Sequence, residues 1–471
     1  MQRISHVLVL LIALILLSLT DPQALLAQGS TIRVPLDVGT LQEAINQISD
    51  GGIIELADGT YSAPANGFII SDLQKSFTIK AASGANPVLD GGGANEIITF
   101  INTNAALGRS VTFEGLTFRN GSTIQDGRAG GVTLQRSTGI FRDCVIENNN
   151  GNQPSSGGGG ALVAEGAIAT FINCTWSGNS AKNFGGGLAI NTGATVNVAN
   201  STFTNNRTNN PGHSITAAGG GIHVGNARLS VTGSTFTGNE AGYVGGGVFA
   251  IGEWQEPVST PRSTVSISDS TFTNNRAVRD PSVSFSLPTE GGAFHAEDQT
   301  TATISNVTFD SNSADVGGAV NTYRGIVNID GSTFTANRAV GTNAASGLGG
   351  AISATSNDAN DVTTNGGASN RRSAMINIEE TIIRGVDGQS MAQTGGGIYL
   401  AGDGNRTYGI NGVNQDGTAA GNRVTATLQK VIFEDTEAHE GSAPGTGVGG
   451  AIAADLADLT LEDTMILAAD A

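Results

Sequence analysis

The chain is built from a short sequence repeat. A glycine step, Gly-Gly followed by Gly or Ala and then an apolar anchor residue, recurs nine times. The anchors are Leu162, Leu188, Ile222, Val248, Phe294, Val320, Ile352, Ile398 and Ile452. Successive anchors are 26, 34, 26, 46, 26, 32, 46 and 54 residues apart, so the unit is 26 residues with insertions in some copies. A fixed unit that accepts loops at set points is typical of a solenoid.

A second motif recurs in phase with the first. It is a Ser/Thr-rich run ending in an aromatic residue, with Asn three positions later. The pairs are Trp176 with Asn179, Phe203 with Asn206, Phe236 with Asn239, Phe272 with Asn275, Phe309 with Asn312, and Phe334 with Asn337. We expect each aromatic ring to be buried, at about 1.5–3 kcal/mol apiece. Asn tolerates positive φ and bonds neighbouring backbone, so we expect this Asn to occupy a turn. The double glycine fits another tight turn.

The repeat predicts the fold. One unit holds about three short alternating runs, such as AVNTY, GIVNID and STFTAN between residues 319 and 337. Alternation points one face of each run inward, yet three short strands cannot close a core alone. Copies must therefore stack strand on strand, about 4.8 Å apart, and parallel crossovers are right-handed. The prediction is an all-β chain forming a single right-handed parallel β-helix with a short N-terminal capping helix.

Composition supports this fold and excludes other classes. The 471 residues include 68 Gly and 40 Asn, which disfavour long helices. A hydrophobic content of 38% with only 14% charged residues argues against disorder. The net charge of −18 argues against a nucleic-acid partner, because such proteins neutralise phosphates with Lys and Arg. An anionic polysaccharide would be repelled unless Ca²⁺ bridged it, and no other cofactor is indicated.

Residues 1–27 are predicted to be a signal peptide. Arg3 precedes an apolar run from Val7 to Leu19, and Ala27 ends a small-residue stretch suited to cleavage. This run is too short for about 30 Å of hydrocarbon, although an uncleaved membrane anchor is the alternative. The expectation is a mature protein that does not span a membrane and is secreted or displayed at the cell surface. If a C-terminal anchor follows the sequence, the location would be the outer membrane.

Residues 28–110 are predicted to form an N-terminal cap and the first coils. Thr40 and Glu43 fit a capping box that opens a short amphipathic helix. Its apolar stripe consists of Leu41, Ala44, Ile45 and Ile48. Such a helix can plug the core and block edge pairing. Residues 111–471 hold the β-helix repeats, and no equivalent cap follows them. We therefore expect the chain to be truncated at its C-terminus relative to a longer protein.

Two stretches carry a family resemblance. The run IRVPLDVGTLQEAINQISDGGIIELADGTYS resembles the start of pectin-lyase-like parallel β-helix proteins. The paired motifs Gly-Gly-Ala-Ile/Val/Leu and Phe-x-x-Asn resemble the polymorphic outer membrane proteins of chlamydial type. The resemblance covers nearly everything from residue 32 onward. It implies the β-helix fold and a secreted or surface-displayed protein of adhesin type.

The catalytic motifs of the pectin-lyase-like enzymes do not occur in the sequence. Pectate lyases carry Trp-Ile-Asp-His and Arg-x-Pro-x-x-Arg, polygalacturonases carry Asn-Thr-Asp and His-Gly, and pectin methylesterases carry Gln-Asp-Thr-Leu; none is found. A β-helix can still bring two carboxylates together from different coils, leaving no local motif. The sequence therefore leans against an enzyme and names no catalytic residue and no metal site.

Two cysteines occupy equivalent places in neighbouring repeats. Cys144 and Cys174 each precede a core anchor by two residues, so they are expected to face inward one coil apart. Strand spacing lies within the range of a disulfide, and a secreted protein sees oxidising conditions. A disulfide and two buried thiols are both open interpretations.

One row of residues is a candidate binding surface. If the anchors point inward, the residues after them point outward: Val163, Ala189, His223, Phe249, His295, Asn321, Ser353, Tyr399 and Ala453. The row and one nearby insertion supply the candidate ligand-binding residues, which are His223, Phe249, Trp254, His295 and Tyr399. Flat aromatic rings beside acidic and amide side chains are suited to binding sugar rings. The alternative is that these rings cover the sheet or contact an inserted loop.

Three functions fit these patterns. The first is an adhesive or structural solenoid, secreted or at the cell surface, without catalysis of its own. The second is a polysaccharide lyase or glycoside hydrolase of the pectin-lyase-like class, although a fold alone does not establish an activity. The third is a non-catalytic carbohydrate-binding protein, so a polysaccharide or cell-surface glycan is the expected partner.

Overall fold

A computed structural model describes most of the chain after the predicted signal peptide. The described residues are 29–71, 75–103, 108–123, 125–153, 157–208, 217–252, 263–279, 288–340, 347–356, 374–385, 392, 395–401, 424–438, 450–455 and 457–467. The predicted signal peptide and its cleavage site lie outside these residues. The proposed boundaries at residues 28, 110 and 111 stay predictions.

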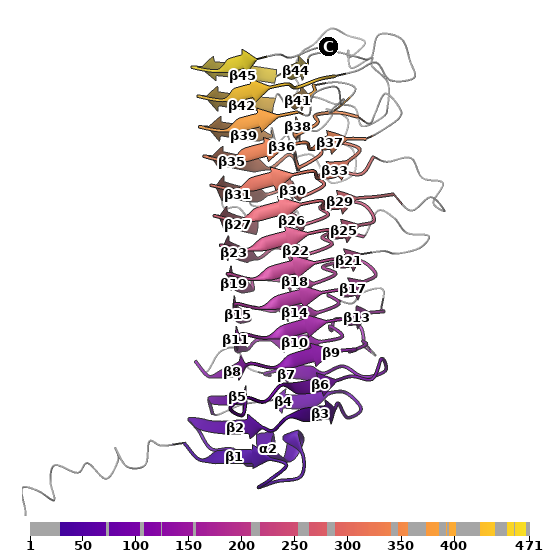
Figure 1. Cartoon of the computed structure of the whole chain (residues 1–471), viewed down its shortest axis with the longest axis vertical. Coiled ribbons are helices and arrows are strands. Elements are labelled where there is room, and N and C mark those ends of the chain that lie inside the picture. Colours follow the sequence, from indigo (N-terminus) through magenta and orange to yellow (C-terminus); the bar gives the residue numbers. More distant parts are fainter. Residues whose placement is uncertain are drawn as a thin grey trace, which may run out of the picture.

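The described chain winds into a right-handed parallel β-helix, as predicted, with three long sheets along its sides (Figure 1). The 14-stranded sheet consists of β1 (Thr31–Val34), β2 (Gly52–Leu56), β5 (Phe77–Ala81), β8 (Ser110–Glu114), β11 (Thr138–Arg142), β15 (Ile168–Ile172), β19 (Thr195–Ala199), β23 (Arg228–Thr232), β27 (Ser263–Ser268), β31 (Thr300–Ser305), β35 (Ile326–Asp330), β39 (Met375–Glu379), β42 (Val424–Gln429) and β45 (Ala457–Glu462). The 13-stranded sheet consists of β3 (Gly59–Ser62), β6 (Pro87–Asp90), β9 (Thr117–Arg119), β12 (Val145–Glu147), β16 (Thr175–Ser177), β20 (Thr202–Thr204), β24 (Thr235–Thr237), β28 (Thr271–Thr273), β32 (Thr308–Asp310), β36 (Thr333–Thr335), β40 (Ile382–Arg384), β43 (Ile432–Glu434) and β46 (Met465–Leu467).

The 12-stranded sheet carries the glycine-step anchors. It consists of β4 (Phe68–Ser71), β7 (Ile98–Ile101), β10 (Val132–Gln135), β14 (Ala161–Ala164), β18 (Leu188–Asn191), β22 (Ile222–Gly225), β26 (Val248–Gly252), β30 (Phe294–Asp298), β34 (Val320–Tyr323), β38 (Ile352–Thr355), β41 (Ile398–Ala401) and β44 (Ile452–Asp455). A fourth, narrow sheet was not predicted, because its two-residue strands are too short to show alternation. Its strands are β13 (Asn150–Gly151), β17 (Ser180–Ala181), β21 (Arg207–Thr208), β25 (Glu240–Ala241), β29 (Arg276–Ala277), β33 (Ser313–Ala314) and β37 (Arg338–Ala339).

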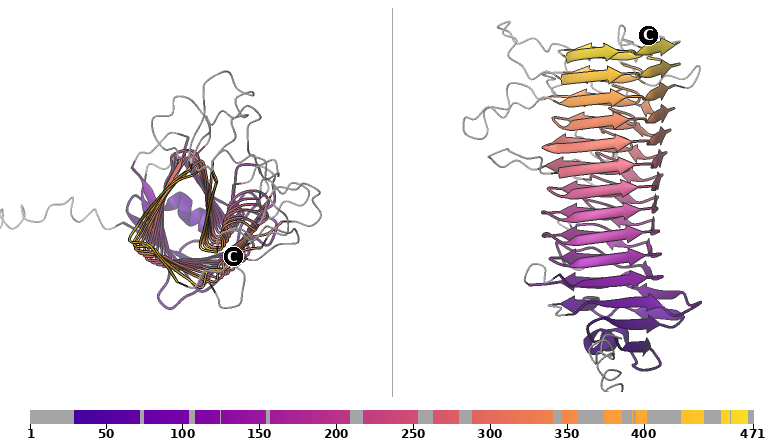
Figure 2. Two further views of the ribbon diagram at one scale, coloured as in Figure 1. Left: turned by 90° about the horizontal axis from the view of Figure 1, so that it is seen from above. Right: turned by 90° about the vertical axis from the view of Figure 1, so that its left-hand side faces the viewer.

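Stacked aromatic rings fill the core. Seen from above, the coils superpose around one narrow interior (Figure 2). The rings of Phe203, Phe236, Phe272, Phe309 and Phe334 form a column with successive centroids 4.8, 4.4, 5.3 and 4.6 Å apart. All five are fully buried. These spacings follow from strand pairing without a register shift, so the predicted burial of the aromatic anchors is confirmed.

The Asn of the second motif lies at a corner between two strands, as Asn206 does between β20 and β21, but the expectation that this Asn itself adopts positive φ was wrong. Asn206, Asn239 and Asn275 are fully buried and point into a ladder that runs along the stack. Each side-chain oxygen accepts from both the backbone N–H and the side-chain amide of the Asn one coil earlier. The positive φ falls one residue before each of them, as at Asn205 (53°) and Asn274 (54°). The Asn side-chain amide carries both N–H donors and a carbonyl acceptor, so each Asn can donate to the next Asn along the stack and accept from the one before it.

The glycine step makes the turn into the 12-stranded sheet. Its first glycine has positive φ, for example 65° at Gly245 and 63° at Gly291. One anchor is displaced from its predicted place: Ala161, not Leu162, is in register with Leu188. The step there is Gly-Gly-Gly-Ala, so the interval to Leu188 is 27 residues (188 minus 161) and not 26.

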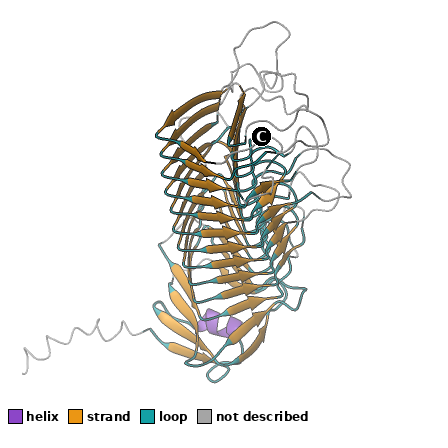
Figure 3. Cartoon of the chain, turned by 45° about the horizontal axis from the view of Figure 1, so that its top comes forward, coloured by secondary structure: helices purple, strands orange, loops and turns teal. Residues whose placement is uncertain are grey.

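The predicted cap is confirmed at the N-terminal end of the stack (Figure 3). Helix α2 (Leu41–Gln47) buries Leu41, Ala44 and Ile45, and Thr40 Oγ1 accepts from the backbone N–H of Glu43. At the other end of the helix, the Lys75 ammonium donates to three backbone carbonyls, those of residues 45, 46 and 48.

The cap also protects a sheet edge. β4 is the first strand of the 12-stranded sheet, and the Gln42 side chain pairs with it. Gln42 donates to the carbonyl of Ile69 (3.0 Å) and accepts from its backbone N–H (2.8 Å). The amide thereby replaces a neighbouring strand and blocks edge-to-edge association. At the opposite end of the described stack, inward positions are open to solvent: Leu461 and Ile466 are 48% and 51% exposed.

Candidate functional site

The predicted row lies on the outer face of the 12-stranded sheet, opposite the core. His223, Phe249 and His295 follow one another in register in adjacent coils, as expected. They are nevertheless only 5%, 4% and 0% exposed, so the expectation of an exposed row was wrong. Asn321 and Ser353 continue the row and are also fully buried.

The chain itself covers this row. Just before each glycine step, one residue forms an isolated parallel bridge with its equivalent in the next coil. We call these the strap residues: Gly157, Phe184, Ala218, Val244, Glu290, Val316 and Leu348. Phe249 is packed against Ala218 and Val244 of the strap. A Cβ on Gly245 would come within 2.7 Å of the Phe249 Cβ, which shows how closely the glycine step folds over the row.

The other predicted members of the row differ. Tyr399 is in register with Ser353 and is half-buried. Trp254 lies outside the described residues. Val163, expected to face outward, points into the core because of the displaced anchor, and Leu162 takes its place in the row. Whether these side chains bind a ligand stays a proposal.

His223 is a neutral packing residue in this arrangement. Its ring lies between Phe184 and Phe249, with centroids 4.5 and 5.5 Å away. Burial lowers the pKa of His223 to about 3, because no nearby charge compensates for the lost hydration of the imidazolium. His223 therefore stays uncharged at physiological pH.

His295 has polar surroundings instead. Its Nε2 lies 3.5 Å from Glu297 Oε2, and its Nδ1 lies 3.7 Å from Glu290 Oε2. Asn321 Nδ2 lies 3.0 Å from His295 Nδ1 and donates to Glu290 Oε2 at 2.8 Å. Because the carboxylate of Glu290 requires the nitrogen end of the amide, Asn321 can only donate to Nδ1. The other ring nitrogen, Nε2, faces Glu297.

Glu297 is the partly exposed member of this otherwise buried cluster. Its side chain is 20% exposed, against 0% for His295 and 5% for Glu290. Glu297 belongs to a second outward row two positions further along the strands, in register with Ile251 and Tyr323. Thr355 follows in the next coil, and Ile251 and Thr355 are half-buried.

The strand ends beside Glu297 carry a second ion pair. Arg324 Nη2 lies 2.6 Å from Asp298 Oδ1. The Arg324 guanidinium also lies over the ring of Tyr323, 4.4 Å from its centroid. Both contacts restrain the guanidinium and keep it over the Tyr323 ring, one coil away from Glu297.

Several buried polar atoms of this outer face have no hydrogen-bond partner among the described residues. They are His295 Nε2, Asn321 Oδ1 and Ser353 Oγ. Buried polar atoms are almost always paired. Their concentration in three adjacent coils marks this part of the outer face as the candidate functional site.

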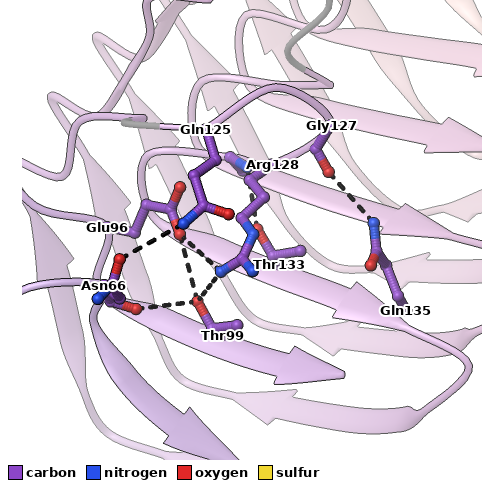
Figure 4. A network of polar contacts seen from close by, with 9 residues as sticks. Asn66, Glu96, Thr99, Gln125, Gly127, Arg128, Thr133 and Gln135 are labelled. Carbon is purple, nitrogen blue, oxygen red and sulfur yellow. Dashed lines mark hydrogen bonds and ion pairs between the residues drawn. The ribbon is translucent and has the colours of Figure 1, made fainter. Parts of the chain in front are cut away.

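A second polar cluster lies on the same face at β7 and β10, the second and third strands of the sheet, and Figure 4 shows its side chains. Glu96 is fully buried, and its Oε2 accepts from Arg128 Nη1 at 3.1 Å. The hydroxyl of Thr99 lies 3.3 Å from the same oxygen and accepts from Arg128 Nη1 at 3.2 Å. At the rim, Gln125 Nε2 donates to Asn66 Oδ1 at 3.4 Å. Among the described residues, Glu96 Oε1 has no hydrogen-bond partner.

Cys144 and Cys174 face the core one coil apart, as predicted, and both are free thiols in the structure. Burial, together with the neighbouring Cys174, raises the pKa of the Cys144 thiol well above its usual value. Whether the pair oxidises to a disulfide stays a prediction.

Two features are absent from the part of the chain that the structure describes. No group of three or more His, Cys, Asp or Glu side chains there is arranged to hold a metal ion. Among those same residues, no helix has the length and apolar character needed to cross a bilayer.

Sequence reasoning found His295 but missed its partners. Glu290 was hidden because it occupies a strap position that is apolar in the neighbouring repeats, such as Val244 and Val316. Glu297 follows His295 by two residues, and this alternation is the one signal that could have placed it on the same face. Glu96 and Arg128 precede the regular repeats, so no spacing linked them.

The chain has distant structural likenesses. No protein-family model matches it, and no curated protein matches it. Among solved structures, pectate lyase Pel9A is 13% identical, with a TM-score of 0.33 over 73% of this chain and 71% of that one. A PL6 alginate lyase in complex with trisaccharide is 14% identical, with a TM-score of 0.45 over 93% of this chain and 88% of that one. The catalytic domain of a GH87 α-1,3-glucanase in complex with nigerose is 11% identical, with a TM-score of 0.34 over 92% and 68%. At these values the likenesses carry no argument about the site.

Proposed function

We propose that the chain is a secreted or surface-displayed β-helix protein that binds polysaccharide through the outer face of its 12-stranded sheet, without catalysis of its own. The observation that carries the proposal is the position of Glu297, whose side chain is 20% exposed and whose carboxylate lies 3.5 Å from His295 at the edge of a buried polar cluster. The proposed role is adhesive or structural, with a polysaccharide or cell-surface glycan as partner.

The chemistry of the row around Glu297 suits a sugar. A carboxylate accepts hydrogen bonds from hydroxyl groups, and its acceptor capacity is large when its position is fixed. Thr355 adds a hydroxyl, and Ile251 offers apolar surface to the C–H groups of a pyranose ring. Tyr323 lies in the row between Glu297 and Thr355, with the Arg324 guanidinium over its ring. Few, fixed polar groups beside apolar surface are the usual composition of a small-ligand site.

Two polymer classes fit the protein less well. A net charge of −18 disfavours nucleic acids and, without bridging Ca²⁺, acidic polysaccharides. The structural neighbours include enzymes that act on pectate, alginate and α-1,3-glucan, but the proposal rests on the side chains of this chain alone.

One observation favours a second candidate function, a polysaccharide lyase or glycoside hydrolase. His295 lies between two carboxylates, 3.7 Å from Glu290 and 3.5 Å from Glu297. A carboxylate close to an imidazole is an arrangement that general acid–base catalysis uses. The non-catalytic proposal is preferred because His295 is fully buried and only Glu297 of this group reaches solvent.

The test combines binding and turnover on one panel of glycans. Polygalacturonate, alginate, xyloglucan and soluble α-glucans are titrated into the protein, with Ca²⁺ and with a chelator. The native chain is expected to bind at least one of them, and Glu297→Gln is expected to weaken that binding at least about tenfold, the effect of losing one charged hydrogen bond. Asn197→Ala, an exposed change on the 14-stranded sheet, is the matched control. Release of unsaturated or reducing ends, lost in Glu297→Gln, would instead establish the enzyme.

A further inference from the structure

The outer face of the 12-stranded sheet carries two polar clusters built in the same way. In the first, buried Glu96 contacts Thr99 and Arg128. In the second, buried Glu290 contacts Asn321 and lies close to His295. Both glutamates come from the segment that leads into a strand of this sheet, and their partners include outward residues of the sheet. Each cluster also keeps a buried polar atom without a hydrogen-bond partner among the described residues, Glu96 Oε1 in the first and Asn321 Oδ1 in the second.

Strand register places the two clusters on a single line. The outward residues follow one another directly from coil to coil, through Thr99, Thr133, Leu162, Ala189, His223, Phe249 and His295. Six steps of about 4.8 Å separate Thr99 from His295, which gives about 29 Å along the axis of the β-helix. The line is straight because no register shift interrupts the pairing of these strands.

The part of the line between the clusters is different in character. Leu162, Ala189 and Phe249 are apolar and buried, and His223 is held neutral between two phenylalanine rings. The polar groups are therefore confined to two places. Both places reach solvent: Asn66 and Gln125 are exposed at the rim of the first cluster, where Arg128 is 21% exposed, and Glu297 is 20% exposed at the second.

We infer that the first cluster, around Glu96, Arg128 and Gln125, is a second saccharide subsite, and that the ligand is a polysaccharide chain lying along the β-helix axis and contacting both clusters. This inference rests on the proposed function. At the first subsite, the guanidinium of Arg128 and the amides of Asn66 and Gln125 supply hydrogen-bond donors and acceptors to sugar hydroxyls. Glu96 is the positioning residue, because its Oε2 fixes Arg128 Nη1.

Two linked sites predict a dependence on ligand length. A di- or trisaccharide cannot span about 29 Å, so it occupies one subsite at a time. A decasaccharide of the same polymer contacts both, and the second contact is intramolecular. We therefore expect the native chain to bind the decasaccharide at least about tenfold more tightly than the trisaccharide, a gain at the low end of linked binding.

The experiment compares native and variant chains on these two fragments by isothermal titration. The fragments come from whichever of polygalacturonate, alginate and xyloglucan binds the native chain. Gln125→Ala changes only the rim, and the pair Arg128→Gln with Glu96→Gln removes the charges of the cluster together, so neither leaves a buried charge unpaired. Both are expected to weaken decasaccharide binding at least about fivefold and to leave trisaccharide binding at the Glu297 site within about twofold. Far-ultraviolet circular dichroism checks that each variant is folded.

The outcomes separate the two proposals. If the native chain binds no glycan of either length, the proposed function itself is overturned. If glycans bind and Glu297→Gln abolishes that binding, while the two cluster variants bind the decasaccharide like the native chain, only the second subsite is overturned. Equal affinity of the native chain for both fragments also contradicts it.

Discussion

The buried Asn ladder provides a quantitative test of the architecture. Asn239 lies in the middle of the ladder and is fully buried. Its Oδ1 accepts from the backbone N–H and the side-chain amide of Asn206, at 3.0 and 2.9 Å. Its Nδ2 donates to the carbonyl of Phe203 and to Asn275 Oδ1, both at 2.9 Å. Asn239→Ala removes all four hydrogen bonds.

The expected cost follows from these contacts. Each intramolecular hydrogen bond contributes a net 0.5–1.5 kcal/mol, so four give about 4 kcal/mol in the free energy of unfolding. The buried N–H of Asn206 loses its acceptor, which places the cost above that of a simple truncation. Asn239→Asp has nearly the same volume, yet it replaces the donor with an acceptor facing Phe203 O and Asn275 Oδ1. It is expected to cost at least as much, although it leaves no cavity.

Equilibrium unfolding in guanidinium chloride, followed by circular dichroism, measures both variants. Asn197→Ala is the control, because Asn197 is an exposed outward residue of β19 in the same coil as the Asn206 ladder position, and it is expected to change stability by less than about 0.5 kcal/mol. A loss below about 1 kcal/mol in both Asn239 variants would show that the ladder does not stabilise the stack. A loss in the Ala variant alone would assign the effect to the cavity.

Three other features give predictions of their own. Because the pKa of His223 in the folded chain is about 3, below its unfolded value near 6.5, the unfolded chain binds the extra proton. The free energy of unfolding should then fall by up to about 1.4 kcal/mol per pH unit between pH 6 and 4, and His223→Phe should remove this part of the slope; an unchanged slope refutes the assignment. Cys144 and Cys174 should not react with thiol reagents in the folded chain. After unfolding without reductant, two reactive thiols per chain are expected, whereas a count of zero thiols would show that the two cysteines form a disulfide. Lys75→Met should destabilise the N-terminal end by about 1–2 kcal/mol, seen as faster amide exchange in α2; exchange like that of the native chain would contradict the role of the ammonium in capping the helix.

The fold was predictable because the repeat encodes it directly. A 26-residue interval between anchors fixes the length of a coil, and alternation fixes which side chains face the core. Phe236 and Phe272 stack as expected because the pairing of their strands has no shift. The displaced anchor at Ala161 shows the limit of this reasoning, since an additional glycine moved the motif by one residue without changing its appearance.

The role of the ladder Asn was missed for a different reason. Asn is common in turns, and the residue before each ladder Asn does adopt positive φ, as Asn205 does. The positive φ expected of the ladder Asn is therefore found at the residue before it. What decides the role of Asn206 is its contact with Asn239 in the next coil, 33 residues away, and local sequence preference does not report such a contact.

The site was only partly predictable. Alternation correctly placed His223, Phe249 and His295 on one outer row. It could not show that the strap covers that row, because the cover consists of contacts of Phe249 with Val244 and with Ala218 of the preceding coil, and alternation within a strand does not report such contacts. It also gave no sign of Glu290, which reaches His295 from a strap position.

Binding of glycans by the native chain and by Glu297→Gln is the measurement that tests the central claim most directly. The account predicts a measurable affinity of the native chain for at least one polysaccharide of the panel. It also predicts at least about a tenfold loss in Glu297→Gln at unchanged circular dichroism, the cost of one charged hydrogen bond. Absence of binding by the native chain, or equal binding by the variant, would contradict a saccharide site at Glu297.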